Sequence, residues 1–209
     1  MVTAGQAVLR LTAAENSSWQ LNLEINSSGF VNQLYRVLDN YKLLTNEKFC
    51  GTSVNLEAQE GKHHTLTALA FDNQNHKLHA TVKDLVANQD HKDDIDIPAC
   101  AYDIAGALMT LRNSRLAPGM KFSVPITNGK KLATVVVEGL SREKLVVGGK
   151  AYNTIRYETF VFDNVLYRRK GRLLLWISDD AQRLPVQMRF LFGFPLGDIT
   201  LDLEKVERL

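Results

Sequence analysis

The chain has 209 residues, of which 45% are hydrophobic and 23% charged, a composition typical of a globular protein and not of a disordered chain. Lys and Arg exceed Asp and Glu by only two, so the charge is too balanced for a protein whose main partner is a phosphate backbone. We therefore expect no nucleic-acid partner. The longest apolar run is strand-sized, which excludes a transmembrane segment.

The N-terminal residues contain no signal peptide. Residues 1–4 are interpreted as a linker or as added residues. They lead directly into residues 5–11, in which apolar and polar residues alternate. Either the protein is cytosolic or a signal peptide has been removed before Met1. We expect the second.

Apolar residues at every second position predict strands in the first half of the chain. The expected strands cover residues 5–11, 19–25, 42–45, 52–58, 65–71 and 77–85. Helical spacing around residues 30–38 predicts a short helix or a broken strand. Asp72–Asn75 supplies the turn between the last two strands, which would pair Ala68 with His79.

The spacing of the apolar residues changes after Pro98. Ile104, Ala107, Leu108 and Leu111 have the spacing of an amphipathic helix. Asp103 is the predicted N-cap, and Arg112 near the other end suits the helix dipole.

Strands return after the Pro118-Gly119 turn. They are expected at residues 121–127, 132–139, 144–147, 154–162, 164–167, 172–177, 184–192 and 198–206. Asn128-Gly129, Gly148-Gly149 and Lys170-Gly171 are hairpin signals. This pattern predicts a mainly β fold, with a single strongly curved antiparallel sheet or partial β-barrel wrapping one central helix. We expect one domain over residues 1–209.

Four histidines lie close together in the sequence, at His63, His64, His76 and His79. The expected strand register separates His64 from His79 by about 13 Å, and side-chain alternation puts His76 and His79 on opposite faces. Solvated histidines are therefore favoured over a metal site, and we expect no metal or other cofactor.

The one dense basic cluster is Arg168, Arg169, Lys170 and Arg172, across a predicted turn. Solvated side chains are the simplest interpretation, and the functional alternative is a turn that faces anionic lipid head groups.

No catalytic motif occurs, whether for a serine hydrolase, a zinc protease or a nucleotide-binding loop. Asp179-Asp180 is better explained by turn capping than by paired-carboxylate catalysis. We therefore expect a protein that is not an enzyme.

Cys50 and Cys100 are the two cysteines. They could form a structural disulfide, remain buried thiols, or place a reactive Cys100 near a helix N-terminus. The disulfide is favoured, and it would require an oxidising compartment.

Aromatic side chains concentrate in the C-terminal strands, where they either fill the core or line an apolar pocket for an acyl chain. The expected pocket lining is Trp176, Phe160, Phe190 and Leu108.

Three segments carry a family resemblance: Leu174–Val186 (LLWISDDAQRLPV), Ile97–Asp103 (IPACAYD) continuing into Ala107–Arg112 (ALMTLR), and Leu116–Gly119 (LAPG). Together they resemble the domain-of-unknown-function 3108 family. The resemblance implies a bacterial exported or envelope protein of no established activity, with a fold akin to the half-barrels of periplasmic lipoprotein carriers. It supplies no catalytic residues, and it implies structural roles for Asp103, Trp176, Asp179 and Pro185.

Together these observations predict a non-enzymatic periplasmic or envelope protein that holds a lipid or acyl chain on the concave face of its sheet. The alternative is an envelope scaffolding module with a self-filled core, which binds another envelope protein.

Overall fold

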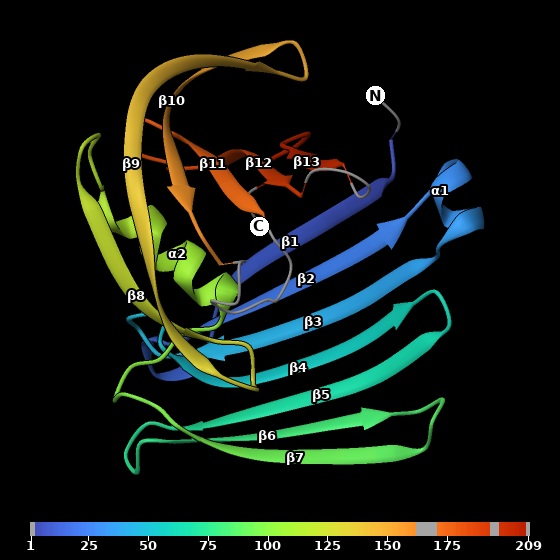
Figure 1. Ribbon diagram of the computed structural model, residues 1–209. Helices are drawn as coiled ribbons and strands as arrows, with labels where there is room; N and C mark the ends of the chain where they lie inside the picture. Colours follow the sequence, from blue (N-terminus) through green and yellow to red (C-terminus); the bar gives the residue numbers. More distant parts are fainter. Residues whose placement is uncertain (1–2, 162–170, 193–196, 208–209) are drawn as a thin grey trace. The chain divides into compact units, whose positions relative to one another are not determined.

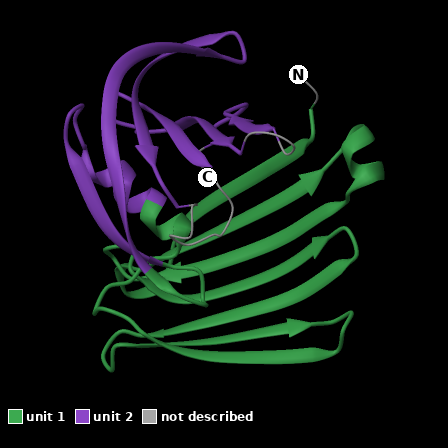
Figure 2. Cartoon of the chain, in the orientation of Figure 1, with its two compact units in different colours: residues 1–107, 127–132 green, residues 108–126, 133–209 purple. Residues whose placement is uncertain are grey.

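The computed structural model describes residues 3–161, 171–192 and 197–207. These residues form two compact units, shown in green and purple in Figure 2. The first unit contains Met1–Ala107 and Thr127–Leu132, and the second contains Leu108–Ile126 and Ala133–Leu209. The single domain expected from the sequence stays a prediction.

The first unit is an antiparallel meander of seven strands whose order in the sheet follows the sequence (Figure 1). The strands are β1 (Gly5–Ala13), β2 (Trp19–Ser27), β3 (Val37–Thr45), β4 (Gly51–Glu60), β5 (His63–Asp72), β6 (Lys77–Asp84) and β7 (Gln89–Asp96). The helical turn η1 (Glu15–Ser17) connects β1 to β2, and the short helix α1 (Gly29–Leu34) connects β2 to β3. Of the two alternatives expected around residues 30–38, the structure shows the short helix, and residues 37 and 38 already belong to β3.

Side-chain alternation gives this sheet one apolar and one hydrophilic face. The strand register aligns Leu21, Leu43, Val54, Leu69 and Ala80 in one row across β2 to β6, and all five side chains are buried. Their neighbours in sequence, such as Asn22, Lys42 and Asn55, lie on the opposite face. The period-2 pattern in the sequence therefore produces the two-faced sheet directly.

The turn between β5 and β6 is displaced by one residue from its expected position. Asp72 pairs with Lys77, so the turn contains residues 73–76, and His76 takes a positive φ of 57°. Ala68 consequently pairs with Thr81, and Ala70 pairs with His79. The turn residues marked the loop correctly, but they did not show which residue adopts the left-handed conformation.

The disulfide between Cys50 and Cys100 is confirmed, with a Cα–Cα distance of 5.1 Å. It fixes the segment after β7 to the start of β4, where the Gly51 N–H also donates a hydrogen bond to the Ala101 carbonyl at 2.9 Å. Trp19 and Phe49 stack beside this connection, with ring centroids 5.8 Å apart.

The helix α2 (Ile104–Ser114) begins where the sequence predicted. The Asp103 carboxylate accepts hydrogen bonds from the Gly106 N–H at 2.8 Å and the Ala105 N–H at 3.3 Å, which confirms it as the N-cap. Burial raises the pKa of Asp103 to about 6, although both hydrogen bonds act in the opposite direction.

The second antiparallel sheet has the order β13-β12-β11-β10-β9-β8. Its strands are β8 (Lys121–Thr127), β9 (Leu132–Val147), β10 (Lys150–Thr159), β11 (Arg172–Ser178), β12 (Pro185–Leu191) and β13 (Asp198–Asp202). One face buries Tyr157 of β10 together with Leu173, Leu175 and Ile177 of β11, and Tyr157 pairs with Leu175 across the two strands. Gly148 and Gly149 form the predicted tight turn between β9 and β10, both with positive φ.

The mainly β class is confirmed, but the strands form two sheets where one was expected. Two strands also differ from the prediction. β9 is continuous from Leu132 to Val147 because a bulge between the Gly139 and Ser141 pairs keeps the ladder intact. β7 was not predicted, because its sequence QDHKDDID is almost entirely hydrophilic. The expected strand at residues 164–167 lies outside the described residues.

Candidate functional site

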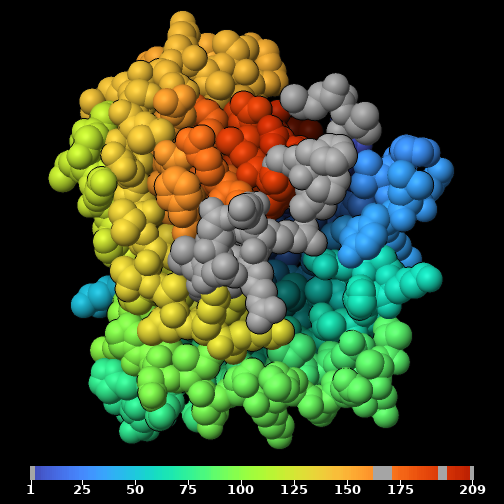
Figure 3. All heavy atoms as spheres, viewed as in Figure 1, coloured from blue at the N-terminus to red at the C-terminus, as the bar shows by residue number. Residues whose placement is uncertain are grey.

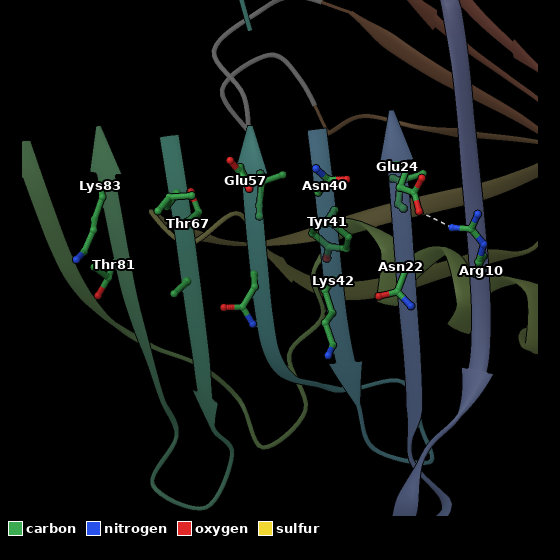
Figure 4. Close-up of a pocket in the computed structure, with 15 residues that line it drawn as sticks. Arg10, Asn22, Glu24, Asn40, Tyr41, Lys42, Glu57, Thr67, Thr81 and Lys83 are labelled. Atoms are coloured by element: carbon green, nitrogen blue, oxygen red, sulfur yellow. Dashed lines mark hydrogen bonds and ion pairs between the residues drawn. The ribbon is translucent and has the colours of Figure 1, made fainter. Parts of the chain in front are cut away.

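A groove of about 670 Å³ crosses the hydrophilic face of the seven-stranded sheet (Figure 4). Two rows of side chains form its walls. The strand register assigns Arg10, Asn22, Lys42, Asn55, Ala68 and Thr81 to one row, and Glu24, Asn40, Glu57, Leu66 and Lys83 to the other. The backbone of Leu23, Tyr41, Leu56 and Thr67 lies between the rows as the floor.

The dimensions of the groove follow from strand geometry. It extends from β1 to β6, a distance of about 24 Å at roughly 4.8 Å between strands. The two rows are separated by two residues along each strand, or about 6.6 Å. The groove is therefore elongated, with its long axis across the strands.

The two acidic residues of the groove are already partnered. Arg10 donates a hydrogen bond to the Glu24 carboxylate. Glu57 Oε1 lies 2.9 Å from His64 Nε2 and 3.5 Å from Gln59 Nε2. Hydrogen bonds from His64 and then Gln59 lower the pKa of Glu57, so this carboxylate is charged at neutral pH.

The two lysines of the groove differ in this respect. Lys83 Nζ lies 4.0 Å from Asp90, at the limit of an ion pair. Lys42 makes no ion pair or hydrogen bond within the described part of the chain. The register pairs Lys42 with Asn22 on β2 and with Asn55 on β4, and Asn40 lies two residues earlier on the same face. We call these four residues the Lys42 cluster.

The apolar face of the same sheet contains two polar groups on β3. Asp39 is 9% exposed, and its carboxylate accepts a hydrogen bond from the Gln59 N–H at 3.2 Å. Burial, with a smaller effect from Glu60, raises the pKa of Asp39 to about 6. The Tyr41 hydroxyl is buried and has no hydrogen-bond partner among the described residues.

The second unit contains a polar network around Trp176. The indole N–H donates to the Glu143 carboxylate, which also lies 3.2 Å from Ser141 Oγ and 3.6 Å from Arg156 Nη1. Trp176 is 5% exposed, whereas the Glu143 and Arg156 side chains are partly exposed, so the network joins a buried indole to the surface of the second unit.

The Ser178–Leu184 turn is held by its own side chains. Asp180 Oδ1 accepts hydrogen bonds from Ser178 Oγ at 2.8 Å and from the Gln182 and Arg183 N–H groups. These bonds lower the pKa of Asp180 although its partial burial alone would raise it. The geometry agrees with the turn-capping interpretation for Asp180, whereas Asp179 Oδ2 accepts a hydrogen bond from Arg142 Nε on β9 at 2.8 Å.

Arg183 fixes this turn to the end of α2. Arg112 donates hydrogen bonds to the Arg183 carbonyl at 2.7 Å and the Gln182 carbonyl at 3.1 Å, and Arg183 Nε donates to the Arg112 carbonyl at 3.3 Å. Arg112 was predicted as a partner of the helix dipole, and the structure gives it this more specific contact.

The four residues expected to line an acyl-chain pocket do not lie on one surface. Phe190 pairs with Leu173 whereas Trp176 pairs with Gln187, so alternation places Trp176 and Phe190 on opposite faces of the six-stranded sheet. Phe160 follows β10 and is 47% exposed, and Leu108 is half-buried in α2. Phe190 instead stacks on Phe192, with centroids 6.2 Å apart.

Of the predicted basic turn, Arg168, Arg169 and Lys170 lie outside the described residues. Arg172 belongs to β11 and forms an ion pair with Glu158. His79 lies 2.7 Å from Asp94, and within the described residues no group of three or more His, Cys, Asp or Glu side chains could hold a metal ion.

The groove is not among the sites predicted from the sequence. A signal was present, because Asn22, Glu24, Asn40, Lys42, Asn55 and Glu57 alternate with apolar residues on three consecutive strands. The apolar positions of this alternation predict the core face, and the polar positions between them form the groove on the opposite face.

The fold and groove define a mainly β protein of two antiparallel sheets, with an elongated polar groove on one of them. A family model described as "Protein of unknown function (DUF3108)" matches residues 1–204, and the chain belongs to this family. No curated protein matches. The resemblance seen in the sequence is thereby confirmed.

One solved structure is similar in fold, a beta-barrel-like protein of domain of unknown function DUF1849 from Brucella abortus. The identity is 7%, the TM-score is 0.57, and the match covers 90% of this chain and 82% of the other. This similarity supports the fold alone. No described helix is long and apolar enough to cross a membrane.

Proposed function

We propose that the protein is a non-enzymatic ligand-binding protein of the bacterial envelope, and that its ligand lies in the groove of the seven-stranded sheet. The polar side chains that alternate along both rows of that groove are the observation that carries the proposal. These Asn, Lys and Glu side chains favour the polar part of a ligand, which includes the head group of a lipid.

The disulfide supports the envelope location. Cys50 and Cys100 are paired, and structural disulfides persist mainly in oxidising compartments such as the bacterial periplasm. This pairing agrees with an exported protein.

Native mass spectrometry tests the proposal. The chain is produced with an export signal, purified without detergent, and measured in native and denatured form. Additional mass that is lost on denaturation would support the proposal, and its fragmentation would identify the ligand class. A bare native mass, together with no saturable binding of lipids or glycans, would contradict it.

An acyl chain on the apolar face is a second candidate, favoured by the Tyr41 hydroxyl. Leu23 and Leu56 flank Tyr41 in register and are only half-buried, and Leu9 at the end of the same row is 39% exposed. A fatty acid carboxyl group could satisfy the buried hydroxyl while its chain covers the row.

A fluorescent fatty acid distinguishes the two faces. If the acyl chain lies on the apolar face, Leu56→Asn weakens its binding and Leu66→Asn on the hydrophilic face does not. The reverse result would contradict this candidate and place the chain in the groove. The scaffolding alternative stays a prediction.

A further inference from the structure

We infer that the Lys42 cluster binds an anionic group carried by an extended, hydroxyl-rich chain, which is the chemistry of an acidic polysaccharide. This inference rests on the proposed function and names the ligand class of the groove. The shared chemistry could come from a free polysaccharide or from the glycan of a glycolipid.

The available charge in the groove is positive and central. The two acids have their partners, since Glu24 accepts from Arg10 and Glu57 lies against His64. Lys42 on β3 has none within the described residues, and the register places it in the row between Asn22 and Asn55. Figure 4 shows Lys42 on the strand next to that of Asn22. A lysine ammonium offers three donors and no acceptor, so an anionic group is its natural partner.

The surrounding side chains suit hydroxyl groups. Each Asn amide both donates and accepts hydrogen bonds, as a hydroxyl group does. Asn40 and Asn55 are exposed, and the Thr81 hydroxyl lies two strands beyond Asn55 in the same row. An alkyl chain would leave these groups without partners, and a neutral glycan would leave Lys42 without one.

The elongated outline of the groove, from β1 to β6, suits an extended ligand. Arg10 is paired with Glu24 and Lys83 lies near Asp90, so Lys42 on β3 is the cation of the groove that an anionic group of such a chain would contact. The two rows contain no aromatic side chain on which bases could stack, which argues against a single-stranded nucleic acid.

Isothermal titration calorimetry with alginate oligosaccharides, an uronic acid chain, tests the inference. We expect saturable binding that weakens with added salt. Lys42→Ala should lower the affinity at least about tenfold, because a hydrogen bond to a charged group is lost. Lys62→Ala, an exposed lysine in the β4–β5 turn, is the matched control and should leave the affinity unchanged. Circular dichroism establishes that each variant is folded.

Three further ligands separate the alternatives. Maltooligosaccharides supply the hydroxyl groups without charge, and equal or tighter binding of them would overturn the role of Lys42. Lipopolysaccharide micelles carry an anionic glycan on a lipid, and binding that depends on Lys42 would support the inference with a lipid-linked source. Phosphatidylglycerol vesicles that bind when alginate and lipopolysaccharide do not would overturn it.

The experiments distinguish failure of the inferred ligand class from failure of the proposed binding function. If native mass spectrometry finds a bound ligand but neither alginate nor lipopolysaccharide binds through Lys42, the ligand class is wrong and the binding function stands. If no ligand of any kind binds, both fail.

Discussion

Arg183 Nη2 donates a hydrogen bond to the Tyr157 hydroxyl at 2.8 Å, and that hydroxyl donates to the Leu116 carbonyl at 2.7 Å. Tyr157 is fully buried and Arg183 is 9% exposed. The guanidinium also lies 5.9 Å from the centroid of the Tyr157 ring. A single phenol therefore joins β10, the Ser178–Leu184 turn and the segment after α2.

Tyr157→Phe should lower the free energy of unfolding by about 2–3 kcal/mol, because it leaves a buried donor and a buried carbonyl without a partner. Urea denaturation measures the change. Tyr152→Phe on the same strand is the control, since its ring lies 5.0 Å from Lys150 Nζ and is half-exposed. Equal effects of the two substitutions would contradict the role of the Tyr157 hydroxyl.

Glu143→Ala should lower the free energy of unfolding by about 1–3 kcal/mol, because the buried Trp176 indole N–H loses its acceptor. Fluorescence in a Trp19→Phe background reports on Trp176 alone, and its emission should shift to longer wavelength in Glu143→Ala.

The matched control for this change is Glu138→Ala on the same strand. Glu138 pairs with Lys121 at 3.4 Å at an exposed position, and removing such a pair costs at most about 1 kcal/mol. Trp176 emission that is unchanged in Glu143→Ala would show that the indole does not depend on this carboxylate.

Most strands could be predicted from the sequence because apolar and polar residues alternate when one face of a strand is buried and the other is exposed. The prediction failed for strands in which this alternation is weak. β7 was missed because an exposed edge strand needs few apolar residues, and the charged side chains of its face are suited to a sheet edge. In Figure 3 the side chains of β6 and β7, in green, form the lower border of the picture.

Register and bulges explain the other differences. The bulge at Leu140 lets β9 continue past Gly139, where the sequence suggested a break, and nothing in the local sequence shows that the ladder resumes. The expected pocket failed for a related reason. Trp176 and Phe190 are both aromatic and close to the core, but their faces depend on the pairing between β11 and β12.

Removal of the disulfide should destabilise the protein by roughly 4 kcal/mol, because the bond closes a loop of 50 residues. Urea denaturation of the oxidised protein and of the Cys50→Ala/Cys100→Ala variant measures the difference. Maleimide should not label the denatured protein unless a reductant is added. Labelling without reductant would show free thiols and weaken the case for an exported protein.

Asp39→Asn should stabilise the protein at pH 7.5 by about 1–2 kcal/mol. Burial raises the pKa of Asp39 to about 6, above its value of 3.8 in the unfolded chain. Between these two values the unfolded chain releases the proton first, so the stability contributed by Asp39 falls as the pH rises from about 4 to about 6. Asparagine keeps an oxygen acceptor for the Gln59 N–H and has no charge to bury.

The difference in unfolding free energy between Asp39→Asn and wild type should therefore be small at pH 4 and reach its full size above pH 6.5. Measuring the difference between two proteins cancels the contribution of Asp103, whose pKa is raised to about 6 in the same way. Asp198→Asn, at an exposed position of β13, should show no such dependence. Parallel stability profiles for wild type and Asp39→Asn would mean that the Asp39 carboxyl is not desolvated by the apolar face around it.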